Sequence, residues 1–109
     1  MDDELKLNQR AIPEAALRDS NAVEMLRVWI AEQGLHCSLK VGMYRESTSV
    51  PEEKAWGTIL ADAARHIATA LHEGYGADAD ESLRAIRESF ARELEAPTSE
   101  LTGDLVRKH

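Results

Sequence analysis

Two neighbouring stretches of the sequence alternate apolar and polar residues, and this alternation limits the chain to a small set of folds. The stretches run from Val23 to Ala31 and from Leu35 to Tyr44, with Glu32-Gln33-Gly34 between them. Because successive side chains of a strand point to opposite faces, this period of two predicts a β-hairpin with one apolar face. The apolar positions are Leu26, Val28 and Ile30 in the first strand and Leu35, Cys37, Leu39, Val41 and Met43 in the second.

The loop of this hairpin must contain an even number of residues, because an odd loop would place the two apolar sets on opposite faces. A two-residue loop at Gln33-Gly34 would pair Ile30 with Cys37. Gln33 is poorly suited to a positive φ, so we favour a four-residue loop. A helix bracketed by Ser20 and Gly34 is an alternative for the first stretch, although the β-branched and aromatic residues at 28–30 favour a strand.

Two later segments show the spacing of amphipathic helices. Apolar residues recur every three or four positions from Pro51 to Glu73, and a narrower stripe runs from Asp80 to Leu94. Pro13 to Arg18 suits one or two helical turns, and residues 46–49 suit a loop. We therefore predict an α+β fold, in which the long helix covers the apolar face of the hairpin and the second helix packs beside it.

The same pattern predicts the domain organisation. Residues 13–97 hold all the strongly patterned segments and should form a single α+β domain. Residues 1–12 are polar and are expected to be a loose N-terminal segment, and residues 98–109 a polar C-terminal tail.

Charge and cysteine content exclude several classes of protein. The 109 residues carry a net charge of −7, which repels phosphate backbones and argues against a nucleic-acid partner. The acidic start Met1-Asp2-Asp3-Glu4 lacks a signal peptide, and the most apolar stretch is too interrupted to span a membrane. A single cysteine, which cannot form an internal disulfide, fits a reducing compartment. We expect a cytoplasmic protein without a membrane partner.

Side chains with catalytic or metal-binding chemistry are few and scattered. His36 and Cys37 are adjacent in a strand, so they point to opposite faces, and we interpret Cys37 as a buried, unreactive thiol. Asp62 and His66 share a helix face and are a weak candidate pair for a metal, but a solvated surface explains them equally well. No nucleophile with a neighbouring base and no glycine-rich phosphate loop occurs. We therefore predict no catalytic residue, no cofactor and no metal.

The second face of the hairpin combines cationic and aromatic side chains on an otherwise acidic protein. Such a surface suits a small anion or an acidic partner. The favoured interpretation is that the N-terminal segment or another subunit covers it, because a central Trp usually packs. The residues of this candidate ligand or partner face are Arg27, Trp29, His36, Lys40 and Tyr44, with Ser38 between them.

Self-association is expected because a two-stranded ribbon is marginal alone and the sequence shows no clear third strand. Its edges would carry unpaired backbone groups, and the small-residue stretch Gly57, Ala61, Ala64 and Ala68 would leave apolar surface uncovered. A symmetric homodimer that buries Trp29 would pair these edges and cover this apolar surface.

Four segments resemble an uncharacterised alphaproteobacterial family of domains of unknown function, DUF5076. They are Leu26-Arg27-Val28-Trp29-Ile30, Leu35-His36-Cys37-Ser38-Leu39, Ala55-Trp56-Gly57 and Ala64-Arg65-His66-Ile67-Ala68. The resemblance spans roughly Pro13 to Pro97 and implies no established activity, cofactor or catalytic residue. The leading hypothesis is therefore a small, non-catalytic interaction or assembly module. A protein that binds a small ligand or anion through Arg27, Trp29, His36 and Lys40 is the alternative, and an enzyme or metal protein using Asp62 and His66 comes third.

Overall fold

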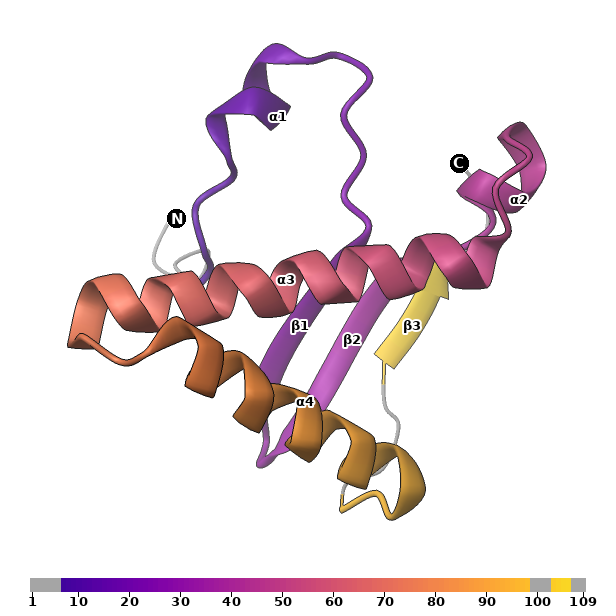
Figure 1. The fold of residues 1–109 in the computed structure, drawn as a ribbon. Coiled ribbons are helices and arrows are strands. Elements are labelled where there is room, and N and C mark those ends of the chain that lie inside the picture. The colour runs from indigo at the N-terminus through magenta and orange to yellow at the C-terminus, as the bar shows by residue number, and fades with distance from the viewer. Residues whose placement is uncertain (1–6, 99–102, 107–109) are drawn as a thin grey trace.

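The computed structural model of the chain describes residues 7–98 and the backbone of residues 103–106 (Figure 1). It confirms the α+β class. Residues 1–6 of the predicted loose segment, and residues 99–102 and 107–109 of the predicted polar tail, lie outside the described residues. The elements are α1 (Glu14–Arg18), β1 (Leu26–Ala31), β2 (Gly34–Lys40), α2 (Met43–Ser47), α3 (Glu52–Tyr75), α4 (Ala79–Glu95) and β3 (Gly103–Val106).

The predicted hairpin is present, with the predicted faces and a shorter loop. β1 and β2 pair antiparallel, with Val28 opposite Cys37 and Ile30 opposite Leu35. The loop consists of Glu32 and Gln33 alone, at φ 53° and 65°. The expected four-residue loop and the pairing of Ile30 with Cys37 were therefore wrong. Two positive φ values match the right-handed twist of the strands in a tight turn, and this geometry prevails over the poor preference of the two side chains.

A third strand was not predicted. β3 pairs parallel to β2, so the sheet has the order β1-β2-β3, and Leu39 lies opposite Leu105. β3 lies within the segment interpreted as a polar tail, and its four residues are too short to show a period of two.

The second strand ends earlier than its apolar pattern indicated. Gly42 adopts φ 103° and turns the chain, and the next five residues form α2 instead of the predicted strand end and loop. Tyr44 therefore lies in a helix and does not continue the face of β2. The first strand also begins later than predicted, at Leu26, and residues 21–25 are not helical.

The two long helices form an antiparallel pair close to their predicted bounds (Figure 1). Gly76, at φ 75°, ends α3 with its N–H bonded to the carbonyl of His72. The Asp78 side chain caps α4 by accepting a hydrogen bond from the N–H of Glu81, at 2.9 Å. The short connection holds the two helices side by side. None of the helices in the described part of the chain combines the length and the hydrophobicity of a membrane-spanning segment.

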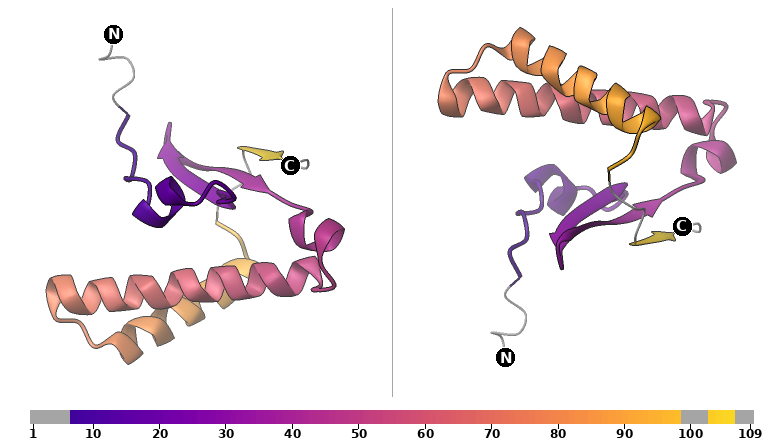
Figure 2. Two further views of the ribbon diagram at one scale, coloured as in Figure 1. Left: turned by 90° about the horizontal axis from the view of Figure 1, so that it is seen from above. Right: turned by 90° about the horizontal axis from the view of Figure 1, so that it is seen from below.

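The sheet and the α3–α4 pair form two layers that stand apart (Figure 2). α3 crosses the sheet as predicted, but it packs against α4 and α2 instead of closing onto the strands. The buried apolar side chains of the described chain are Ala55 and Ala68, at 7% and 3% exposure. The expectation that α3 covers the apolar face of the sheet is therefore not met within one chain, because Val28, Ile30 and Leu35 remain 48%, 81% and 42% exposed.

Candidate functional site

The hairpin register brings four of the five predicted face residues together. Trp29 lies directly opposite His36, and Arg27 lies opposite Ser38. Lys40 follows Ser38 on the same face of β2, because alternate residues of a strand share a face. Tyr44 does not join them, since it belongs to α2.

Neighbouring groups already engage two of these side chains. The Arg27 guanidinium binds the Glu24 carboxylate through Nη2 at 2.7 Å and Nε at 3.2 Å. His36 Nε2 lies 3.1 Å from the carbonyl oxygen of Ala31, within hydrogen-bonding distance. A bidentate arginine–carboxylate pair is close to neutral as a unit. The face is consequently less cationic than its composition suggested.

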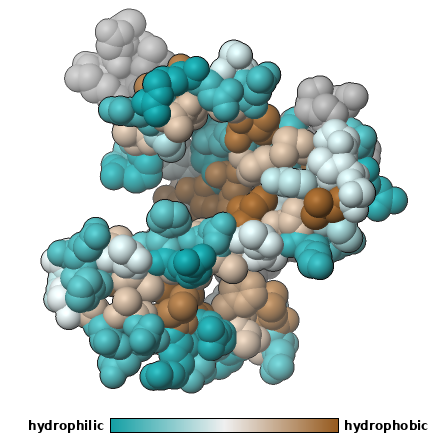
Figure 3. Space-filling model, turned by 45° about the horizontal axis from the view of Figure 1, so that its top comes forward, coloured by the Kyte–Doolittle hydropathy of each residue, from teal (hydrophilic) through white to brown (hydrophobic). Residues whose placement is uncertain are grey.

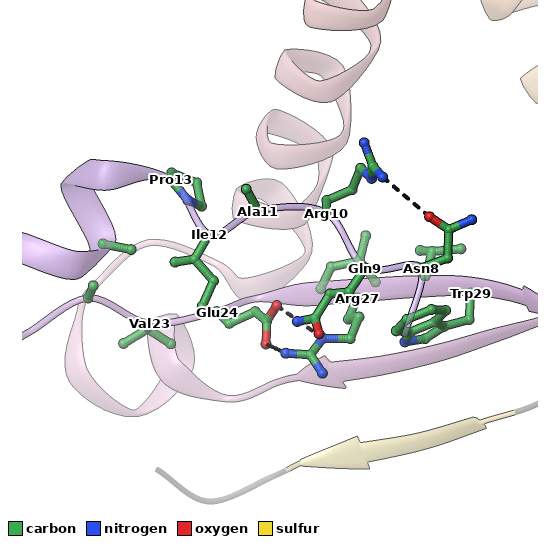
Figure 4. A pocket seen from close by; sticks show the side chains of 14 residues that line it. Asn8, Gln9, Arg10, Ala11, Ile12, Pro13, Val23, Glu24, Arg27 and Trp29 are labelled. Atoms are coloured by element: carbon green, nitrogen blue, oxygen red, sulfur yellow. Dashed lines mark hydrogen bonds and ion pairs between the residues drawn. The ribbon is translucent and has the colours of Figure 1, made fainter. Parts of the chain in front are cut away.

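A groove of about 670 Å³ runs between the N-terminal segment and β1. Residues 8–13 form one wall, and the other includes Leu26, Arg27, Val28 and Trp29. Figure 4 shows Asn8 and Gln9 above Trp29 and Arg27, with Glu24 joined to Arg27. Leu26 and Val28 belong to the opposite face of β1 from Arg27 and Trp29, so the groove follows the outer edge of the strand.

The remaining candidate residues, Asp62, His66 and Cys37, are not brought together into a site. Asp62 pairs with Arg65, with Oδ1 3.4 Å from Nη1, so its carboxylate is directed to a cation rather than to His66. Cys37 is half-buried in the apolar register of β2, opposite Val28. In residues 7–98, no group of three His, Cys, Asp or Glu side chains is placed to hold a metal ion.

Glu52 forms a polar cluster that the sequence did not reveal. Its carboxylate accepts hydrogen bonds from the backbone N–H groups of Gly42, Tyr44 and Arg45 at 2.9–3.0 Å. It also accepts one from the indole Nε1 of Trp56, at 3.0 Å. These donors, the Gly42 N–H first, lower the pKa of Glu52 below its usual value, against an opposing effect of desolvation.

The Glu52 cluster fastens α2 to the first turn of α3. Glu and Trp four residues apart on a helix can interact, and that spacing was the one available signal. The three backbone donors depend on the turn at Gly42, which the sequence pattern did not show. We interpret the cluster as structural, because all its partners are groups of the chain itself.

Hydrophobic residues gather in the hollow between the two layers (Figure 3). Val41, which follows β2, lines a pocket there with Trp56 and Leu60 of α3. Because Val41 continues the alternation of Leu39 and Cys37, the apolar face of the sheet is the one that faces α3. The described chain thus carries two apolar layers that face each other without closing.

Comparisons with known proteins place the chain among relatives without giving it an activity. Residues 9–98 match the model of a domain of unknown function, DUF5076. A solved structure from the photosynthetic bacterium Rhodopseudomonas palustrus CGA009, provisionally named a pyruvate dehydrogenase, is similar to it. The two chains are 28% identical, with a TM-score of 0.63, over 89% of this chain and 93% of the other. None of the curated proteins matches the sequence.

Proposed function

Since the chain belongs to the DUF5076 family of domains of unknown function, we propose its role from the geometry: it is a small assembly module that works as a homodimer. It has no catalysis of its own in this proposal. The observation that carries it is the uncovered apolar surface between the sheet and the α3–α4 pair.

The accessible surface of the chain is too large for a compact monomer. It measures 9378 Å², whereas a folded monomer of 12.1 kDa exposes about 6,000 Å². Even if the residues outside the described ranges were fully exposed, they would contribute only about 2,000 Å². The remaining excess, roughly 1,400 Å² on the same scaling, is comparable to what one subunit buries in an obligate dimer.

The exposed surface also has the right composition for a permanent interface. Large apolar side chains are exposed on both layers, and obligate interfaces resemble a hydrophobic core cut in half. The sheet contributes Val28, Ile30 and Leu35, and the helices contribute Leu60, Ile67, Phe90 and Leu94, each at least 37% exposed. A second copy is the simplest partner, because it presents the same unfilled layers and two-fold dimers are the commonest closed assembly.

The charge and the cysteine content of the module bear on its environment. A net charge of −7 and a pI near 5.0 favour a protein that avoids nucleic acid and anionic membrane surfaces. The single cysteine favours a reducing compartment such as the cytoplasm. The small-anion alternative through Arg27, Trp29, His36 and Lys40 gains little support, because Glu24 already occupies the Arg27 guanidinium.

Light scattering behind a sizing column tests this proposal. We expect a mass near twice 12.1 kDa over a hundredfold dilution that starts above micromolar concentration. A folded monomer at every concentration, with far-ultraviolet circular dichroism showing intact helices, would contradict it.

A further inference from the structure

The outer edge of β1 carries unpaired backbone groups at identifiable residues. The N–H of Lys40 donates to the carbonyl of Met25 at 3.0 Å, so Met25 and Lys40 form a hydrogen-bonded pair of the antiparallel ladder. Such pairs alternate with non-bonded ones. Arg27, Trp29 and Ala31 therefore direct their backbone groups inward to β2. The residues that direct theirs outward are Leu26, Val28 and Ile30.

These outward groups have no hydrogen-bond partner among the described residues, where β1 pairs with β2 alone. β1 is the first strand in the sheet order β1-β2-β3, and the groove separates its edge from residues 8–13 (Figure 4). β1 has no proline, lysine or bulge, the features by which natural proteins usually protect an edge strand. Its single charge, on Arg27, is compensated by Glu24. The edge is therefore open to another strand.

We propose that β1 pairs antiparallel with β1 of a second copy, with Val28 on the two-fold axis. This inference rests on the proposed homodimer and specifies how its two sheets join. Two antiparallel strands can pair only when outward residues lie opposite outward residues. Leu26, Val28 and Ile30 are spaced by two, so centring on Val28 sets Leu26 opposite the partner's Ile30. All three outward residues then lie in hydrogen-bonded pairs.

Other registers are less favourable. A shift by one residue would set outward groups against inward ones and form no ladder. A shift by two residues would leave one of the three outward residues without a partner within the strand. The register centred on Val28 also places Arg27 opposite the partner's Trp29, which allows a cation–π contact. On the other face it brings Leu26, Val28 and Ile30 of both chains together in one apolar stripe.

The resulting sheet would be continuous across the two chains. Its strand order would be β3-β2-β1 followed by the same strands of the partner in reverse. Such a sheet has a wider apolar face than a single hairpin and leaves the β1 edge protected. The groove beside β1 is the space that the second strand would enter.

Cysteine cross-linking tests the register directly. In a Cys37→Ala background, Val28→Cys places two thiols across the axis, where the Cα atoms of a hydrogen-bonded antiparallel pair are about 5.5 Å apart. This distance suits a disulfide. Ile30→Cys is the matched control, because four strand residues, or about 13 Å, would separate its two copies. With copper phenanthroline as oxidant, we expect the Val28→Cys dimer to form at least tenfold faster than the Ile30→Cys dimer.

Two results would overturn the proposed register. One is equal cross-linking of the two variants, and the other is no cross-linking of Val28→Cys in a protein that light scattering shows to be dimeric. Either result would refute the pairing of the β1 edges but not the homodimer. A folded monomer would refute both the homodimer and the edge pairing. Val28→Pro is a second test, because it removes an outward N–H and leaves the β1–β2 ladder intact. We expect Val28→Pro to lower the dimer fraction at least tenfold, and an unchanged dimer fraction would count against the edge pairing.

Discussion

Phe90 offers the sharpest test of whether the exposed apolar surface belongs to an interface. Along one face of α4, Leu83 and Ile86 are half-buried, whereas Phe90 is 50% exposed and Leu94 71%. The exposure rises along the helix because α4 diverges from α3 toward its end (Figure 1). The apolar stripe of α4 is therefore covered near its start and exposed near its end. We infer that a further partner covers the exposed end.

The expected effect of Phe90→Ala follows from the exposed half of the ring. A phenylalanine side chain buries 150–250 Å² when fully covered, so the exposed half is about 100 Å². At about 25 cal/mol per Å², covering it in the dimer contributes roughly 2.5 kcal/mol per chain and roughly 5 kcal/mol per dimer. We expect Phe90→Ala to raise the dimer dissociation constant by more than about 1,000-fold.

Sedimentation velocity over a dilution series measures this change. Tyr75→Ala is the matched control, because Tyr75 is 86% exposed at the end of α3 and lies off the stripe, so its removal should leave the dissociation constant within about threefold of the unmodified protein. Circular dichroism confirms that both variants keep their helices. A folded Phe90→Ala protein that dimerises as tightly as the unmodified chain would refute the assignment of this stripe to an interface.

Three further predictions concern stability. Replacing Glu32-Gln33 by Asn-Gly should stabilise the protein by about 1–2 kcal/mol in urea unfolding, because both positions have positive φ; a loss of stability would contradict the turn geometry. The pKa of Glu52 is lowered by hydrogen bonds, first from the Gly42 N–H, so its stabilisation is present above its usual pKa of 4.5 and lost as pH falls through the lowered pKa. Glu52→Gln should therefore flatten the acid side of a plot of melting temperature against pH, and an unchanged acid side would argue against this cluster. Ala68→Leu should cost about 1–3 kcal/mol by overfilling a site that is 3% exposed, whereas equal effects of Ala68→Leu and the exposed control Ala70→Leu would place the helix contact elsewhere.

The hairpin faces and the long helices could be predicted because their patterns are local. Alternation over five or more residues identifies the two faces of each strand. Any loop with an even number of residues then keeps Val28 and Cys37 on the same face of the hairpin. The α3 and α4 bounds followed from apolar spacing, the proline before α3 and the glycine after it. The same alternation placed Arg27, Trp29, His36 and Lys40 on one face.

The parts that the sequence did not reveal depend on contacts far apart in the chain. The Glu52 cluster joins a helix start to a turn ten residues earlier, and its donors are backbone groups that carry no sequence signal. β3 is four residues long, so its pairing with β2 depends on tertiary placement rather than on period. The separation of the two layers could not be foreseen either, because apolar patterning shows which residues need burial but not which chain buries them.

The concentration dependence of unfolding tests most directly whether one chain needs a second to complete its core. When folding is coupled to dimerisation, mass action raises the thermal midpoint with protein concentration. We predict that the midpoint of unfolding, followed by circular dichroism, rises by several degrees over a hundredfold increase in concentration. A cooperative transition whose midpoint stays constant over that range, in a protein of monomer mass, would contradict the account.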